Sequence, residues 1–89
     1  MKTTIFGILD NYGFERKTKS TMRWGCGSLV WGHIAEVKNL GNDFYEIRYH
    51  HWQYDEWGEP VIDEQISTVL HGALTLQYLF ERLPLFRRW

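Results

Sequence analysis

The segment "SLVWGHIAEVKNLGNDFYEIRYHHWQY", residues 28–54, decides the fold of this chain. Residues 28–38 and 44–54 are rich in β-branched and aromatic residues and read as strands. Between them lies "NLGND", a turn-rich loop of hairpin length. We therefore predict that these two stretches form an antiparallel hairpin.

A symmetric pairing about this loop determines which side chains share a face. Ala35 then lies opposite Ile47, His33 opposite Tyr49, and alternate residues point to opposite faces. The better core candidate is the face formed by Trp31, His33, Ala35, Val37, Tyr45, Ile47, Tyr49 and His51. The other face pairs charges across the strands and ends in an aromatic cluster, with Glu36, Lys38, Phe44, Glu46, Arg48, His50, Trp52 and Tyr54.

The chain after this hairpin predicts one more strand and a helix. "DEWGEP" (55–60) is a turn, and residues 61–69 form a third strand that returns beside the second. A helix follows from Leu70 to Leu83, with Ser67 or Thr68 as its cap and Pro84 at its end. Its apolar residues cover more than one stripe, so we expect it to be buried on several sides or used in an interface.

The chain before the hairpin begins with a short helix over residues 3–13. Thr3 or Thr4 caps its start, and Gly13 supplies a left-handed end. Its apolar stripe consists of Ile5, Ile8, Leu9 and Tyr12. The basic stretch 14–27 fits a charged edge strand and an irregular loop equally well.

These elements predict a single α+β domain over residues 1–89. It has a short N-terminal helix, a three- to four-stranded antiparallel meander and a C-terminal helix. Both helices are expected on one face of the sheet, which leaves the other face open.

Composition limits the class of protein. Aromatic residues make up 17% of the chain, and because each ring carries about 150–250 Å² of buriable surface, we expect some of them to be exposed. The single cysteine, Cys26, excludes an intrachain disulfide and fits a reducing cytoplasm. The apolar run at the start is too short and interrupted for a signal peptide or membrane span. We expect a cytoplasmic protein with no membrane association.

The net charge of −1 conceals separate acidic and basic segments. Residues 55–64 contain five acids and no Lys or Arg, whereas 16–23 contain four bases and 82–88 three, both without an acid. The overall balance is not that of a duplex-DNA binder, which neutralises phosphates with an excess of bases.

Metal and catalytic sites find little support. Adjacent His50 and His51 on a strand point to opposite faces, and His33 and His51 lie two positions apart in the symmetric register. No metal-ligand spacing is present. As a nucleophile with a histidine as its base, Cys26 would need activation by the nearby Lys19 and Arg23, but nothing orients them, and Asp63 and Glu64 alternate in direction. We assign no catalytic residue, metal or cofactor and expect a non-enzymatic protein.

Two binding functions remain open. The aromatic face with Arg48 and Lys38 resembles the stacking surfaces of single-stranded nucleic-acid binders, although the acids beside it oppose that use. Protein binding fits more features, because Trp, Tyr and Arg are enriched at interface hot spots. The predicted partner-binding residues are Trp52, Tyr54, Asp55, Glu56, Trp57 and Glu59.

The same residues indicate the kind of partner. An acidic hairpin complements a basic surface, and carboxylates along a ribbon imitate a phosphate backbone, so a larger nucleic-acid-handling protein is a reasonable target for an inhibitor or adaptor. A thin core and a free sheet face also favour a homodimer.

Overall fold

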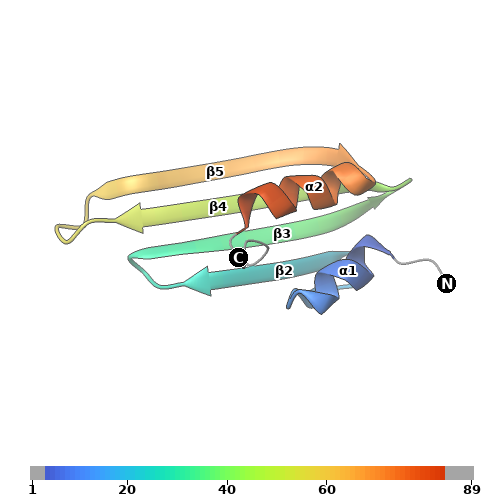
Figure 1. The fold of residues 1–89 in the computed structure, drawn as a ribbon, viewed down its shortest axis with the longest axis horizontal. Helices are drawn as coiled ribbons and strands as arrows, with labels where there is room; N and C mark the ends of the chain where they lie inside the picture. The colour runs from blue at the N-terminus through green and yellow to red at the C-terminus, as the bar shows by residue number, and fades with distance from the viewer. Residues whose placement is uncertain (1–3, 84–89) are drawn as a thin grey trace.

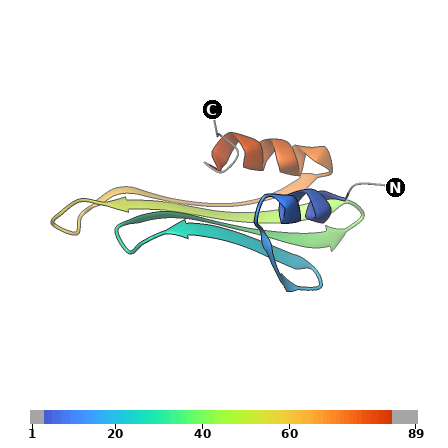
Figure 2. The ribbon, with the colours of Figure 1, turned by 60° about the horizontal axis from the view of Figure 1, so that its bottom comes forward.

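The computed structural model describes residues 4–83 and shows a five-stranded antiparallel meander with both helices on one face (Figures 1 and 2). The predicted α+β class is confirmed, with five strands where three to four were expected. We call the side with the helices the covered face and the opposite side the open face. The elements in chain order are α1 (Ile5–Asn11), β1 (Glu15–Thr18), β2 (Thr21–Gly27), β3 (Trp31–Gly41), β4 (Phe44–Tyr54), β5 (Pro60–His71) and α2 (Ala73–Arg82).

Helix α1 begins and ends as predicted. The Thr4 hydroxyl accepts a hydrogen bond from the Gly7 N–H at 2.9 Å, and Thr3 lies outside the described residues. Gly13 has φ +94°, and the Phe14 N–H then donates to the Leu9 carbonyl at 3.1 Å. The buried side differs from the predicted stripe, because α1 buries Ile5, Phe6 and Leu9 whereas Tyr12 is 41% exposed.

The basic stretch 14–27 forms a hairpin rather than a loop. Strands β1 and β2 are joined by a tight turn at Lys19 and Ser20, and a register shift interrupts their pairing between Arg16 and Thr18. Phe14 and Met22 are buried on the covered face. The stretch is thus two strands divided by a turn, and in the second strand Met22 is buried whereas the next residue, Arg23, is exposed.

The central hairpin is confirmed, but its predicted register is wrong by two residues. Asn42 and Asp43 both have positive φ, 54° and 64°, which is the pattern of a two-residue type I′ turn. Gly41 consequently pairs with Phe44, and an irregularity between Asn39 and Gly41 absorbs Leu40.

The observed register gives β3 and β4 different cross-strand partners, but each side chain stays on the face predicted for it. Ala35 lies opposite Tyr49 instead of Ile47, and Val37 lies opposite Ile47. The type I′ turn follows the twist of the strands, so a two-residue turn replaces the five-residue loop. Because the shift is an even number of residues, each side chain keeps its predicted face.

The boundary between the last strand and the last helix also differs from the prediction. Strand β5 continues to His71, so Ser67 and Thr68 lie in the sheet and do not cap α2. The chain turns at Gly72, where φ is +55° and the N–H donates to the Asp43 carbonyl at 2.8 Å. Glycine adopts this conformation without a steric penalty, which sets the corner. Pro84 lies outside the described residues.

The core lies between the helices and one half of the sheet. Its members are Ile5, Phe6, Leu9, Phe14, Met22, Ala35, Val37, Tyr45, Ile47, Tyr49, Leu79 and Leu83. Ala35, Val37, Tyr45, Ile47 and Tyr49 belong to the face predicted as the core. Helix α2 buries Thr75 and Leu79 but leaves Leu74 and Phe80 substantially exposed. The wide apolar surface of this helix is thus only partly covered by the described residues.

Candidate binding surfaces

The hairpin formed by β4 and β5 extends beyond the rest of the sheet (Figure 1). The Tyr54 N–H donates at 2.7 Å to the carbonyl of Val30, the residue before β3, and residues 55–59 continue past this contact. We call residues 28–31 and 54–61 the distal end, and the opposite end, where both helices lie, the proximal end.

The loop at the tip is fixed by Asp55. Its Oδ1 accepts hydrogen bonds from the N–H groups of Trp57 and Glu59, both at 2.9 Å. The Asp55 N–H donates to the Glu59 carbonyl at 2.9 Å as well. One oxygen of this carboxylate therefore holds the loop closed, as short acidic side chains do in turns.

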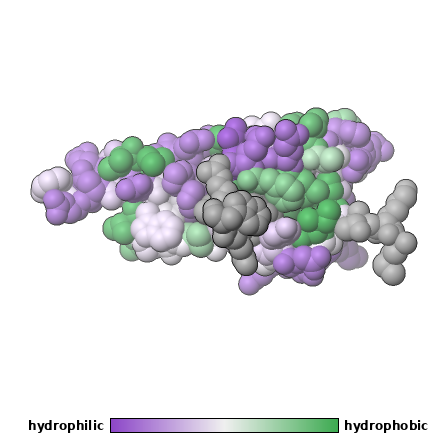
Figure 3. All heavy atoms as spheres, viewed as in Figure 1, coloured by the Kyte–Doolittle hydropathy of each residue, from purple (hydrophilic) through white to green (hydrophobic). Residues whose placement is uncertain are grey.

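Large apolar side chains are exposed at the distal end. Leu29 is 92% exposed and Trp57 77%, and they are joined by Val30, Trp31 and Val61. Glu56 and Glu59 stand beside Trp57 on the same loop and are exposed. Figure 3 shows the covered face, with hydrophobic atoms gathered around the helices and a mainly hydrophilic tip that carries separate hydrophobic patches. The distal end therefore combines apolar side chains with negative charge.

The six predicted partner-binding residues fall into two groups. Asp55, Glu56, Trp57 and Glu59 form the tip loop. Trp52 instead lies on the open face, where its Nε1–H donates to the Ser28 carbonyl at 2.9 Å and its ring covers Gly32. Half-buried Tyr54 lines the same part of the open face as Trp52. The structure thus brings four of the six together in the tip loop and places the other two, Trp52 and Tyr54, on the open face.

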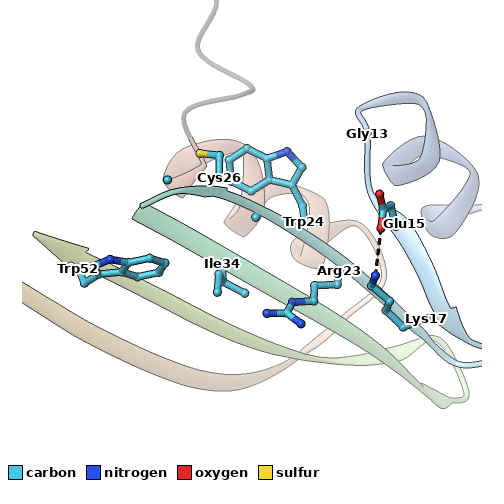
Figure 4. Close-up of a pocket in the computed structure, with 10 residues that line it drawn as sticks. Gly13, Glu15, Lys17, Arg23, Trp24, Cys26, Ile34 and Trp52 are labelled. Carbon is cyan, nitrogen blue, oxygen red and sulfur yellow. Dashed lines mark hydrogen bonds and ion pairs between the residues drawn. The ribbon is translucent and has the colours of Figure 1, made fainter. Parts of the chain in front are cut away.

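The open face contains a hollow of about 450 Å³ beside Trp52. Figure 4 shows Trp52, Ile34 and Arg23 along it, whereas Trp24 and Cys26 point to the opposite side of the sheet. The hollow exists because Gly25 and Gly27 occupy positions on the open face and carry no side chain. The ion pair between Lys17 and Glu15, at 3.0 Å, borders it near β1.

Charges alternate across the open face. One cross-strand row runs from β1 to β4 through Glu15, Arg23, Glu36 and Arg48. Arg48 also pairs with Glu46 along its own strand at 3.5 Å. Since each base has an acid beside it, this surface offers no continuous positive track.

His50 and Trp52 extend this face toward β5. Their ring centroids are 4.9 Å apart, and His50 Nε2 lies 2.9 Å from the Asp63 Oδ1. His50 was expected to point outward with Trp52, and it does. This contact links the imidazole to the edge strand β5.

The covered face carries a pair of histidines, His33 and His51, whose contact the predicted register missed. His33 and His51 lie directly opposite each other rather than two positions apart, and their rings stack at 4.0 Å with an interplanar angle of 12°. His33 Nδ1 is 2.7 Å from the Tyr49 hydroxyl. Burial, and secondarily the charge of His51, lowers the pKa of His33 from its ordinary value of 6.5.

The stacked histidines line a hollow of about 240 Å³ that also includes Glu64 and the end of α2. Cys26 follows in the same cross-strand row, next to His33. Within residues 4–83, however, no three histidine, cysteine or carboxylate side chains are arranged to hold a metal ion.

Sequence reasoning missed several residues of these surfaces. Val61 follows the predicted turn 55–60, and Leu29 and Val30 lie at the start of the predicted strand 28–38, so apolar character at the strand ends was the available signal. Arg23 was assigned only to a basic stretch, because its position on the open face depends on the β1–β2 hairpin. Such placements require strand order, which the chain order alone did not define.

No family model, no curated protein and no solved structure matches this chain. Neither α1 nor α2 has the length and hydrophobicity that a membrane-spanning helix requires, and residues 4–83 form no other α-helix.

Proposed function

We propose that this chain is a small non-catalytic protein-binding module whose distal end occupies a site on a larger protein. The partner's site would be apolar in its centre and basic around it. A nucleic-acid-handling protein is the class we propose, because the surfaces that hold phosphates are basic. Occupying such a surface would make the chain an inhibitor or an adaptor.

The observation that supports this proposal is the 77% exposure of Trp57 on a loop that its own acidic residues surround. A tryptophan presented on a closed loop loses little conformational freedom on binding, and tryptophan is prominent among interface hot spots. Glu56 and Glu59 would speed association with a basic surface. The exposed Leu29 on the neighbouring loop would enlarge the apolar contact.

The experiment compares proteins captured from native cell lysate by immobilised wild-type chain and by Trp57→Ala. A second comparison uses the double variant E56K/E59K against the matched control D10K/E81K, which makes the same change in net charge on the two helices, away from the distal end. Asp55 is left intact because it holds the loop. We expect a partner that the wild type and the control retain, with binding at least about tenfold weaker for either distal variant.

Nuclease treatment of the lysate separates direct protein binding from capture through nucleic acid. A partner retained equally by all of these variants would refute the distal end as the binding surface. Loss of every partner after nuclease treatment would refute protein binding as such.

A second candidate function is single-stranded nucleic-acid binding on the open face. The hollow beside Trp52, with Arg23 at its border, has the aromatic and basic components of a base-stacking site. The alternating charge row argues against it, because Glu15 and Glu36 flank Arg23.

Titration of labelled oligonucleotides at low and high salt tests this alternative. Arg48→Ala removes an open-face base, and Arg16→Ala is the matched control on the covered face, where its guanidinium lies over Phe6. Binding that weakens with salt and in Arg48→Ala alone would favour nucleic acid. Absence of binding at low salt would exclude it.

A further inference from the structure

The two edges of the sheet differ in how they are protected. Strand β1 has 4 residues, includes Arg16 and Lys17, and its pairing with β2 is irregular. Short length, positive charge and irregular pairing are the devices by which natural sheets prevent edge-to-edge association. Strand β5 has 12 residues and contains no Lys or Arg, and its proline, Pro60, stands at the first position. Its pairing with β4 is regular from Phe44 to Gln53.

The backbone of β5 presents hydrogen-bonding groups at this edge. In an antiparallel ladder, alternate residues direct both N–H and C=O to the same neighbour. The Tyr54 N–H points to β3, so the odd-numbered residues of β4 face β5. The β5 residues that pair with them are even-numbered, so the even-numbered residues of β5 direct their N–H and C=O groups to β4. The hydrogen bond from the Gly72 N–H to the Asp43 carbonyl follows the same pattern. The odd-numbered residues of β5 therefore direct their N–H and C=O groups outward: Asp63, Gln65, Ser67, Val69 and His71.

We propose that two copies of this chain pair antiparallel along β5, with Ile66 opposite Ile66 of the partner subunit. Outward-directed residues then meet each other, because Gln65 lies opposite Ser67 of the partner subunit. Roughly eight backbone hydrogen bonds would form between residues 63 and 69 of the two chains. The result is a continuous ten-stranded sheet with all four helices on one side.

The side chains of β5 are self-complementary in this register. Ile62 lies opposite Leu70 of the partner subunit on the covered face, where Ile66 and Leu70 are only partly buried and already pack against the core. These are non-hydrogen-bonded pairs, in which side chains approach most closely. Pairing two copies therefore completes the burial of the core at its β5 border.

Charge also favours a second copy in this register. Glu64 lies opposite Thr68 of the partner subunit, and Asp63 opposite Val69 of the partner subunit, so no two carboxylates face each other. Moving the axis to Gln65 would instead place Glu64 against Ile66 of the partner subunit. The Ile66-centred pairing places Ile66 against Ile66 and Ile62 against Leu70 of the partner subunit in the closest pairs, and it sets Glu64 against the polar Thr68 of the partner subunit, which is why we select it.

This assembly goes beyond the proposed function and does not depend on it. Because the copies run antiparallel, their distal ends project from opposite ends of the joined sheet. Residues 55–59 remain outside the paired segment in both chains. A dimer would therefore offer two equivalent tips to partners.

The first test measures molecular mass against concentration by sedimentation equilibrium. We expect a species of twice the mass of the 10.7 kDa chain that dissociates on dilution. Ser67→Pro removes an outward N–H while leaving the β4 ladder intact, and should weaken dimerisation at least about tenfold. The matched control, Ser67→Ala, keeps the N–H and should dimerise as the wild type does.

A wild-type chain that is monomeric at every concentration would overturn the proposal, as would unchanged dimerisation of folded Ser67→Pro. If the β5 edge instead binds a strand of a different protein, the purified wild-type chain would be monomeric. Circular dichroism checks that the proline variant is folded.

A second test is independent of the proline variant and reports the register. In a Cys26→Ser background, Ile66→Cys places two thiols across the two-fold axis in a non-hydrogen-bonded pair, where Cβ atoms approach to about 4.5 Å, the upper end of the separation that a disulfide spans. Mild oxidation should yield a covalent dimer. The control Gln65→Cys faces Ser67 of the partner subunit and should not crosslink comparably. Efficient crosslinking of Gln65→Cys, or no crosslinking of Ile66→Cys, would refute this register.

Discussion

The proximal and distal ends of the sheet are built from the same strands, yet only one end is a core. At the proximal end Val37 and Ile47 lie under the helices and are fully buried. At the distal end Trp31, on the same face as Val37, is 50% exposed. Strand pairing continues through both ends, so hydrogen bonding does not distinguish them.

The difference follows from length. A strand of 11 residues such as β4 spans about 37 Å, whereas a helix of 10 residues such as α2 spans about 15 Å. The described molecule accordingly measures 50 Å along its longest axis and 26 Å across. Two short helices at one end leave the other end uncovered among residues 4–83. One end can therefore hold the fold together while the other is available for binding.

The largest expected effect is a truncation in the core. Ile47→Ala should lower the free energy of unfolding by about 2–5 kcal/mol, because it opens a cavity at a fully buried position. Val61→Ala, at the distal end, is the matched control and should stay within about 0.5 kcal/mol of the wild type. Urea denaturation measures both free energies of unfolding. Equal losses for the two variants would mean that the two ends contribute equally to stability.

Gly32 lies on the open face at the border of the distal end, so its substitution tests the packing of Trp52 there. A Cβ at this position would lie 2.4 Å from Cζ2 of Trp52 and 2.8 Å from the Cys26 carbonyl oxygen. Gly32→Ala should therefore cost about 1–3 kcal/mol and displace the indole ring. Tryptophan fluorescence and urea denaturation report the two effects. Gly25→Ala, whose Cβ would meet only Ile34 and the His33 carbonyl at 3.3 Å or more, is the milder control.

The stacked histidines predict a pH dependence that originates between the two ends. The folded-state pKa of His33 is below 6.5, whereas the unfolded chain takes up this proton near pH 6.5. The unfolded state therefore binds more protons between these two values. Stability falls as pH is lowered from 7 through 6.5, and this contribution levels off below the folded pKa.

Denaturation at several pH values checks this sign. His33→Gln should flatten the contribution, and His51→Gln should reduce it, since the neighbouring charge is the lesser of the two causes. A wild-type chain whose stability rises on acidification through this window, with the rise lost in His33→Gln, would contradict the assignment.

The smallest expected change in stability is at the tip. Trp57→Ala should alter the free energy of unfolding by no more than about 0.5 kcal/mol, because the side chain is mostly exposed. The same variant is expected to lose the captured partner. A large loss of stability in thermal denaturation would instead mean that Trp57 supports the fold, and would remove the contrast on which the proposed function rests.

Local chemistry made part of the architecture predictable. Thr4 and Gly13 mark the limits of α1 through capping and positive φ, which depend on neighbouring residues alone. The alternation in 44–54 identified the buried face, because the two-residue period survives any even shift in register. It also placed Trp52 on the face opposite Tyr49 and Ile47.

Other features depended on contacts between segments. The start of α2 was predicted at Leu70, whose helical spacing with later leucines is real, but Leu70 pairs with Tyr45 in the sheet instead. Stretch 14–27 was ambiguous because its strands are stabilised by β3 and the core rather than by their own composition. Tertiary pairing overrides local preference in both places.

The sequence by itself determined the class of fold, the faces of the central strands and the acidic character of the tip, since these follow from side-chain periodicity and residue type. Only the tertiary structure decided the register that stacks His33 on His51, the position of Arg23 on the open face, and the contrast between a short β1 edge and a long β5 edge. These depend on which segments meet and on how far two short helices reach along longer strands, and neither property is encoded in any one stretch of chain.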